Sequence, residues 1–327
     1  MDKVRVAMIG CGGFQRHRVS NLLKVKDAEI VALVDPSPDQ IRMMKDQYPS
    51  LAGLETFSDH VEMLQQVRPD AVMIATPHTQ HVTQILDAFE HGAHALTEKP
   101  MVTTVEDAHK VIAARDKAGK VGMVSYQRHF QPEFRYMKQQ IESGVAGAVQ
   151  YITVLQSQEW LRAVAGTWRQ TQALSGGGQL NDSGSHVLDI VLWVTGQSPA
   201  KVAAFCDNKG TEVDINSSLS VTFQSGAMAS FAIIGDGMSW HEEITVWCDN
   251  MAFFIRDGKL TTVDRARNKF FAENLTGGST PDQNFIDAIL GKAVCESPFE
   301  AGLEVIRLTE AAWKSSDAGG MPVTVTG

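Results

Sequence analysis

The chain has 327 residues, of which 43% are hydrophobic and 20% charged, so its composition is that of a globular protein long enough for two domains. A formal net charge of −9 argues against sequence-independent nucleic-acid binding and against binding to anionic membranes, because both need a cationic surface. Apolar runs are too short for a signal-peptide core or a membrane span, which predicts a cytoplasmic protein. The widely spaced cysteines predict reduced thiols; they are Cys11, Cys206, Cys248 and Cys295.

Short apolar runs alternate with helix-period stretches in the first third of the chain. The expected strands are "VRVAMI", "EIVALVD", "DAVMIAT", "AHALTEK" and "VGMVSY". Helices are expected between them, from Phe14, from Pro38, and at "HVTQILDAFEHG" and "VEDAHKVIAARDKAG". Strands that are apolar nearly throughout, separated by amphipathic helices, predict a parallel sheet covered on both faces. We therefore expect a doubly wound α/β (Rossmann) domain over residues 1–126.

The pattern changes after residue 126, where apolar and polar residues alternate. The runs "SLSVTFQ" and "EITVWCD" each place their apolar residues on one face, which predicts a large, mostly antiparallel sheet with one open face. Two helical segments follow at "PDQNFIDAILG" and "AGLEVIRLTEAAWKSS". We expect a C-terminal α+β domain over residues 127–327. An open apolar face would be unusual on a monomer, so we expect a homodimer or homotetramer that packs through this sheet.

The stretch "IGCGGFQRHR" at residues 9–18 lies between the first strand and the first helix. Gly10 and Gly12 suit a tight turn in which backbone N–H groups and the positive helix end approach a pyrophosphate. Gln15 stands where such turns usually have a third glycine, whose main role is close packing of helix and strand. We expect Gly13 to supply compensating freedom, and the Gln15 side chain to lie over the phosphate side of a bound cofactor.

Asp35 ends the second strand, at about the position where a carboxylate meets an adenosine ribose. A carboxylate accepts hydrogen bonds from ribose hydroxyls and repels a 2′-phosphate, so the pattern favours NAD over NADP. Glycine-containing turns and strand-ending aspartates also occur without a cofactor. The turn, the strand and Asp35 together nevertheless favour dinucleotide binding.

The chain resembles the glucose–fructose oxidoreductase/inositol dehydrogenase family, often called Gfo/Idh/MocA. The resemblance covers essentially the whole length and rests on "GCGG" at the turn, "ATPHTQH" at 75–81, "EKP" at 98–100 and "GGGQLNDSGSHVLD" at 176–189. It implies an NAD-dependent oxidoreductase whose Glu98 and Lys99 lie at the nicotinamide. It also implies that Thr76, Pro77 and His81 line the cofactor, and that Asp182 and His186 face the substrate. The cofactor-binding residues that we expect are Gly10, Gly12, Gly13, Phe14, Gln15, Asp35, Thr76, Pro77, His81, Glu98, Lys99 and Gln127.

Lys99 ends a strand of the predicted parallel sheet, at the edge where such sheets bind ligands. Oxidised nicotinamide is a cation, so Lys99 would release its proton more readily and suit acid/base work or the orientation of a hydroxyl. Asp182, His186 and Asp189 are spaced to share one helix face, where a carboxylate can orient the His186 ring as it takes a proton. The alternatives are a solvated Lys99, an Asp182 that only caps the helix, and an Asp189 with a structural partner.

The expected activity is hydride transfer between NAD and a secondary alcohol of a sugar, cyclitol or sugar derivative, with Lys99, His186 and Asp182 as catalytic residues. One alternative uses bound NAD transiently for elimination of a glycosidic bond, and another is a non-catalytic cofactor-sensing protein. We expect no metal, because His78 and His81 have no third ligand at a suitable spacing. The expected substrate-binding residues are Lys99, Arg128, Trp168, Arg169, Asp182 and His186.

Overall fold

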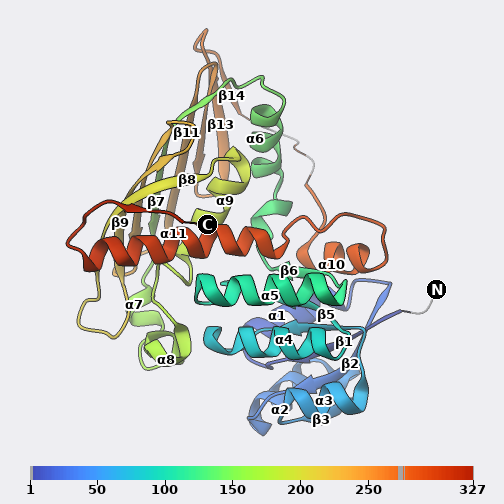
Figure 1. Cartoon of the computed structure of the whole chain (residues 1–327). Helices are drawn as coiled ribbons and strands as arrows, with labels where there is room; N and C mark the ends of the chain where they lie inside the picture. Colours follow the sequence, from blue (N-terminus) through green and yellow to red (C-terminus); the bar gives the residue numbers. More distant parts are fainter. Residues whose placement is uncertain (1–2, 272–274, 276, 327) are drawn as a thin grey trace. The chain divides into compact units, whose positions relative to one another are not determined.

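The computed structural model describes residues 3–271, 275 and 277–326 of the chain. These residues divide into two compact units, whose helices and strands are labelled in Figure 1. The first unit comprises Met1–Val102, Glu106–Ser125 and Ser279–Gly302. The second comprises Thr103–Val105, Tyr126–Gly278 and Leu303–Gly327. The chain therefore passes between the units more than once.

A six-stranded parallel sheet forms the centre of the first unit, which confirms the predicted doubly wound domain. Its strands are β1 (Val4–Ile9), β2 (Ala28–Val34), β3 (Glu55–Phe57), β4 (Ala71–Ile74), β5 (His94–Thr97) and β6 (Gly122–Val124). They lie in the order β3-β2-β1-β4-β5-β6, so the topological switch point falls beside β1. The four residues of β4 are all fully buried, as expected for a strand with both faces covered.

The helices of the first unit are α1 (Gly13–Leu22), α2 (Pro38–Gln47), α3 (His60–Val67), α4 (His81–Glu90), α5 (Val105–Ala118) and α10 (Pro281–Ile289). Short 3-10 turns lie at η1 (Pro49–Leu51) and η2 (His78–Gln80). Side chains cap some of these helices: Asp59 accepts a hydrogen bond from the Glu62 backbone N–H, and Thr280 accepts one from that of Gln283. By contrast, α1 begins after Gly12 without a side-chain cap.

The segment Ser279–Gly302, which carries α10, packs within the first unit although it follows the second sheet in sequence. The Val124 N–H donates to the Ser297 carbonyl at 2.9 Å, and Arg115 forms an ion pair with Glu300 at 2.6 Å. We keep 1–126 and 127–327 as the proposed domains along the chain. The returning segment adds structure to the first of them.

The second unit is built on a nine-stranded sheet, in which β10 and β7 are parallel and the other pairs are antiparallel. Its strands are β7 (Val149–Ser157), β8 (Pro199–Asp207), β9 (Asn216–Phe223), β10 (Met228–Ile234), β11 (His241–Cys248), β12 (Met251–Arg256), β13 (Lys259–Asp264), β14 (Lys269–Phe271) and β15 (Val323–Thr324). The predicted large, mostly antiparallel C-terminal sheet is confirmed.

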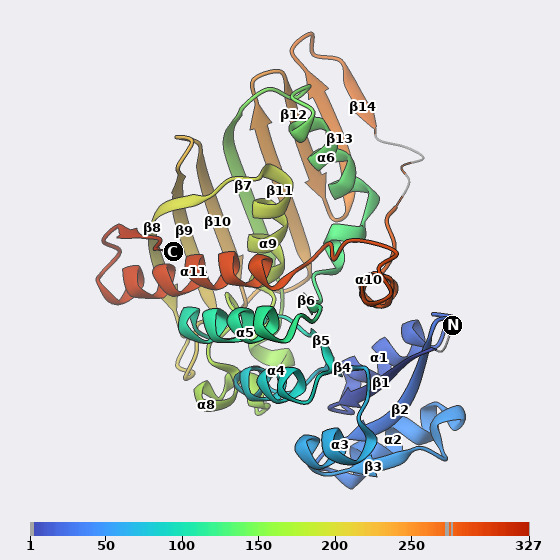
Figure 2. The same cartoon turned by 45° about the vertical axis from the view of Figure 1, so that its right-hand side comes forward.

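Helices cover one face of this sheet, as Figure 2 shows for α6 and α9. The helices of this part of the chain are α6 (Pro132–Glu142), α7 (Trp160–Ala163), α8 (Gln172–Ser175), α9 (Gly184–Thr195) and α11 (Phe299–Asp317), with 3-10 turns at η3 (Gln127–Phe130) and η4 (Trp168–Gln170). Ile152 and Val154 of β7 are buried, whereas Tyr151, Thr153 and Leu155, which alternate with them, are partly buried or exposed. The alternation read from the sequence is thus present. Among the described residues, no helix is long and apolar enough to cross a membrane.

Candidate active site

A cavity of about 360 Å³ lies at the carboxyl ends of β1, β2 and β4. Gly10, Val34, Pro36, Thr76 and Gln84 are among the residues that line it. Ligands of open α/β sheets bind outside the carboxyl ends of the strands at the switch point, so this cavity has the location of a cofactor site.

The glycine turn after β1 fits a dinucleotide. Gly10 has φ +89°, and a Cβ there would lie 2.5 Å from the Ala75 carbonyl oxygen, so only glycine is accommodated. A Cβ on Gly12 would meet nothing within 4 Å, which leaves open space beside the uncapped first turn of α1. Unpaired N–H groups at a helix N-terminus attract anions. The turn therefore offers room and donors for a pyrophosphate.

Asp35 follows β2 and is bound to the backbone through both carboxylate oxygens. Its Oδ2 accepts the Cys11 N–H at 2.8 Å, and its Oδ1 accepts the Ser37 N–H at 2.8 Å. Each oxygen retains a further lone pair, because an ionised carboxylate has about four acceptor sites. Asp35 can thus hold the glycine turn closed and still accept hydrogen bonds from ribose hydroxyls.

Gln15 does not lie where the sequence analysis expected it. Its side chain is fully buried, and its Nε2 donates to the Met73 carbonyl of β4 at 2.8 Å. The buried residues of α1 recur at helical spacing: Gln15, Arg18, Val19 and Leu22. Gln15 therefore faces the sheet and not the phosphate side, and the expectation for its side chain is wrong. Phe14, the expected cofactor residue that precedes Gln15, is half exposed.

The segment after β4 holds Thr76, Pro77 and His81. Thr76 lines the cavity and donates through Oγ1 to Gln84 at 2.6 Å, and Pro77 directly precedes η2. His81 is fully buried, with Nδ1 2.9 Å from the Pro100 carbonyl and Nε2 3.1 Å from the Thr76 carbonyl. Burial lowers the pKa of His81, and the neutral ring has a single N–H, which donates to one of these two carbonyl oxygens.

Glu98 and Lys99 follow β5, and the peptide bond between Lys99 and Pro100 is cis. Glu98 is buried, and its Oε1 lies 2.9 Å from Nη1 of Arg18. Burial raises the pKa of Glu98, while the Arg18 guanidinium opposes this shift. Lys99 is half-buried at the carboxyl edge of the sheet. Arg18 was not predicted to be part of this site, because nothing in the local sequence distinguishes it from the other basic residues of the stretch 9–18.

Asp182 directly precedes the Ser183 N-cap of α9, so it lies before the helix and not on it. Its Oδ2 accepts hydrogen bonds from Trp160 Nε1 at 2.9 Å and from Arg169 Nε at 3.1 Å. His186 lies in the first turn of α9, with its ring edge-on to that of Tyr126 at 6.3 Å between centroids. Asp182 and His186 thus lie four residues apart, the first just before α9 and the second in its first turn.

Asp189 does not serve as an orienting carboxylate for His186. It is buried and lies 3.0 Å from Nε2 of His129, whose ring stacks on Trp193 at 4.3 Å. Burial raises the pKa of Asp189, and the His129 ring opposes this. Of the alternatives considered for Asp189, the structural partner is therefore correct.

The remaining expected substrate residues differ in their surroundings. Arg128 is buried and forms a bidentate ion pair with Glu242 at 2.8 and 2.7 Å, so its guanidinium is already engaged. Arg169 stacks on Trp168, with 4.5 Å from the guanidinium carbon to the ring centroid. Gln127 is exposed at the start of η3.

The glycine run before α9 is held by Asp214, which the sequence analysis did not single out. Asp214 accepts the N–H groups of Gly178 at 2.9 Å and Leu180 at 2.8 Å, and also Nε1 of Trp313 at 3.0 Å. A Cβ on Gly178 would lie 1.8 Å from the Asp214 carbonyl oxygen. This close approach explains the glycine and fixes the segment that leads to Asp182.

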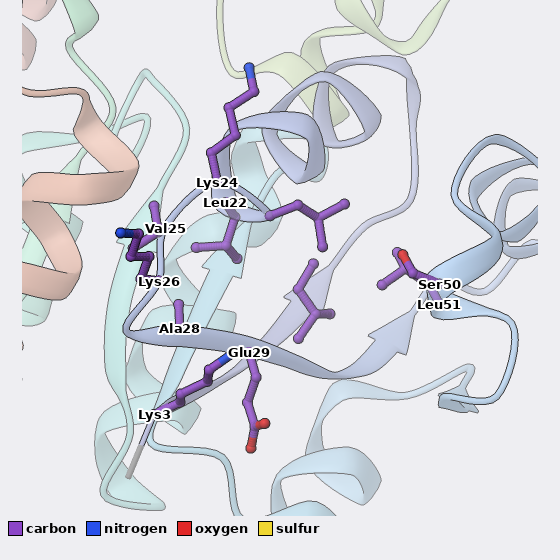
Figure 3. A pocket seen from close by; sticks show the side chains of 11 residues that line it. Lys3, Leu22, Lys24, Val25, Lys26, Ala28, Glu29, Ser50 and Leu51 are labelled. Carbon is purple, nitrogen blue, oxygen red and sulfur yellow. The ribbon is translucent and has the colours of Figure 1, made fainter. Parts of the chain in front are cut away.

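A second cavity in the first unit, of about 430 Å³, is shown in Figure 3. It is lined by Lys3, Leu22 and Ala28 among others, and so lies at the amino ends of β1 and β2. That edge is opposite to the one at which such sheets bind cofactors. Among the described residues, no group of three or more His, Cys, Asp or Glu side chains is arranged to hold a metal ion.

Two domain models of one family match the chain. "Oxidoreductase family, NAD-binding Rossmann fold" of the GFO_IDH_MocA group matches residues 4–126, and "GFO/IDH/MocA C-terminal domain" matches residues 134–252. The chain is 33% identical over 186 residues to the putative oxidoreductase YteT of Bacillus subtilis (strain 168), which covers 54% of this chain and 42% of the relative. It is 29% identical over 194 residues to D-glucoside 3-dehydrogenase of Escherichia coli (strain K12), with 59% and 54% covered. These matches thus span about half the length of the curated relatives.

The fold is similar to that of a solved levoglucosan dehydrogenase, determined with NADH and levoglucosan, with a TM-score of 0.88 and 20% identity over 100% of both chains. At this identity the likeness concerns the fold alone.

Proposed function

Because the chain belongs to the Gfo/Idh/MocA oxidoreductase family, we propose that it is an NAD-dependent dehydrogenase of a secondary alcohol in a sugar, cyclitol or sugar derivative. The observation that carries the proposal is the glycine turn at the carboxyl edge of the Rossmann sheet, with open space at Gly12 and a fixed carboxylate at Asp35. The substrate class follows the name of the D-glucoside 3-dehydrogenase relative and stays part of the proposal.

The first unit supplies the residues for the cofactor. Bound NAD would accept or return a hydride at its nicotinamide ring. The N–H groups at the start of α1 would bind the pyrophosphate, and Asp35 would bind the adenosine ribose. Arg16 of the same turn donates through Nη1 to the Cys11 carbonyl and to Gln40 Oε1, both at 2.8 Å. A 2′-phosphate would meet the Asp35 carboxylate at this position, which favours NAD over NADP.

The proton chemistry is assigned to His186 and Lys99. The imidazole of His186 would take the proton of the reacting hydroxyl, since histidine changes charge near neutral pH. Asp182 is held by Trp160 and Arg169, so its carboxylate has a fixed position in the segment that leads into α9. Lys99 would donate a hydrogen bond to the substrate oxygen.

Two other functions use the same residues. Transient oxidation by bound NAD, followed by elimination of a glycosidic bond and return of the hydride, needs the same cofactor site and the same acid/base groups. A non-catalytic cofactor sensor needs the turn and Asp35 alone. The presence of Lys99, Asp182 and His186 together supports catalysis over sensing.

The proposal predicts that Lys99→Ala and His186→Ala lower kcat by about 10²- to 10⁴-fold, the usual contribution of a positioned acid or base. NADH affinity, measured by fluorescence titration, should change by less than about threefold, because neither side chain is assigned to the pyrophosphate or the adenosine ribose. The matched control is Lys110→Ala, since Lys110 is an exposed lysine of α5 that pairs with Glu106. Turnover near that of the unmodified protein in Lys99→Ala would contradict the mechanism.

A further inference from the structure

Arg18 is buried directly behind Glu98. Its Nη1 donates to Glu98 Oε1 at 2.9 Å and to Ser125 Oγ at 2.6 Å, and its Nη2 lies 3.4 Å from Asp282 Oδ1. Only 4% of Arg18 is exposed, and Glu98 and Asp282 are buried as well. The guanidinium therefore joins four places in the first unit: α1, the end of β5, the end of β6 and α10.

The arrangement is not one that stability alone would favour. Burying charges costs several kcal/mol per ion, and a buried ion pair is often no more stable than apolar residues of the same volume. Nε and Nη2 of Arg18 are buried and make no hydrogen bond with the part of the chain that the structure describes. The burial of this charge therefore needs a reason, and the carboxylate that the guanidinium contacts directly precedes Lys99.

Arg18 links the two ends of the cofactor site. It lies in α1, whose first turn is the proposed pyrophosphate site, and it binds the carboxylate that immediately precedes Lys99. On the other side of Lys99, Pro100 is held through its carbonyl by His81 at 2.9 Å. The backbone of Lys99 is therefore fixed on both sides, by Arg18 through Glu98 and by His81 through Pro100.

We propose that Arg18 is a positioning residue of the reaction, which holds the Glu98 carboxylate and thereby fixes the turn that carries Lys99. This inference rests on the proposed function and deepens it. The rival role is a purely structural one, in which Arg18 only attaches α10 through Asp282.

The charges around Glu98 give a direct readout of its contact with Arg18. Arg18 of α1, Lys99 of the same turn and Ser125 after β6 favour its ionised form, whereas burial and Asp282 of α10 oppose it. In Arg18→Met the carboxyl loses its main counter-charge, so its pKa rises and it takes up a proton at a higher pH. In Asp282→Asn the pKa of Glu98 moves the other way. Both shifts follow from charge alone, so they show whether Arg18 keeps Glu98 ionised, and the kinetic test below separates positioning from a structural role.

The first test reads the state of Glu98 without any substrate. Infrared difference spectra are recorded at pH 7 between each protein and its Glu98→Gln derivative. The proposal predicts a protonated-carboxyl band for Arg18→Met and none for the unmodified protein or Asp282→Asn. A band in the unmodified protein, or none in Arg18→Met, overturns the proposal. If Arg18→Met does not fold, Arg18→Gln and Arg18→Lys are used, with the band expected in the first and absent in the second.

The second test reads function. Arg18→Met should lower kcat about 100-fold, the loss typical of a reacting group displaced by about 1 Å, and its activity should rise with pH at higher values than in the unmodified protein. Arg18→Lys should recover part of kcat. The matched control is Arg115→Met, because Arg115 also ties the returning segment to the first unit, through Glu300, without contacting Glu98. Equal losses of kcat in the two methionine variants, with unshifted pH profiles, would mean that Arg18 is only structural.

Failure of the proposed function would be distinguishable. If no alcohol of the sugar class is oxidised by the unmodified protein, the dehydrogenase assignment fails, whereas the infrared result still decides whether Arg18 keeps Glu98 ionised.

Discussion

Gly10 and Gly12 are glycines for different physical reasons. Gly10 needs its positive φ and its contact with the Ala75 carbonyl, so the fold itself requires glycine there. Gly12 has φ −64° and ψ 176°, which other residues adopt, and a Cβ on it would meet no protein atom within 4 Å. The protein itself therefore does not require glycine at this position, and we infer that a bound pyrophosphate does.

We therefore expect Gly10→Ala to destabilise the protein by about 1–3 kcal/mol, from backbone strain and the close contact. Gly12→Ala should change stability by less than about 1 kcal/mol, the scale of an N-cap effect, yet weaken NADH binding about tenfold by crowding the pyrophosphate. Thermal denaturation and fluorescence titration of both variants measure the two effects. Unchanged NADH affinity in Gly12→Ala would contradict the assigned pyrophosphate site.

The site residues that could be predicted from the sequence are those whose residue type is explained by their immediate neighbours in the chain. Gly10, Gly12 and Asp35 follow from strand, turn and spacing. The direction of Gln15 depends on the rotational phase of α1, which the motif does not specify. Asp189 was assigned to the wrong neighbour because His129, its actual partner, lies 60 residues earlier in the chain, and no periodic pattern records such a pairing.

At the scale of the elements, the spacing of apolar residues along the chain was sufficient to predict most of the strands and the open face of the second sheet. Both helices of the C-terminal segment were expected from their apolar spacing. The packing of α10 within the first unit was not, because it depends on contacts such as Val124 with Ser297 that join distant parts of the chain. The cluster of Arg18, Glu98 and Asp282 depends on this packing and therefore could not be predicted from the sequence pattern.

The pairing of β5 with β6 is expected to depend on pH. His94 begins β5, and its Nδ1 accepts the N–H of Val121, just before β6, at 2.8 Å. Burial, with a contribution from Lys120, lowers the pKa of His94 to about 4. In the unfolded chain the His94 ring titrates at about 6.5. The stability due to the neutral ring is therefore present above that pH and is lost as the pH falls toward 4.

Melting temperatures measured in steps from pH 7 to pH 4 test this expectation. The unmodified protein should lose stability over the interval, and His94→Leu should show a smaller loss, although it is less stable at pH 7 because the Val121 N–H lacks its acceptor. The two slopes would be equal if His94 were solvated, which would contradict the assignment.

At the scale of the whole molecule, one face of the second sheet is covered by no helix of the described part of the chain. Tyr151, Leu155, Trp247 and Phe254 share this face, and Trp247 is 48% exposed. A homodimer or homotetramer formed through this face remains our proposal, because so many apolar side chains are seldom left open on a monomer.

Sedimentation at micromolar concentration should give the mass of a dimer or tetramer, and Trp247→Lys should lower it, because a buried lysine opposes the contact. Val294→Lys is the matched control, since Val294 is 78% exposed and belongs to the first unit. A monomeric mass for the unmodified protein would contradict the proposal.

The central claim is that the chain oxidises a secondary alcohol with net reduction of NAD. The most direct measurement is NADH absorbance, followed together with product, for a panel of sugars, polyols and sugar acids. The account predicts that at least one member of the panel yields NADH in a one-to-one ratio with oxidised product. Product formed without accumulation of NADH, or NAD binding without turnover of any member, would contradict it.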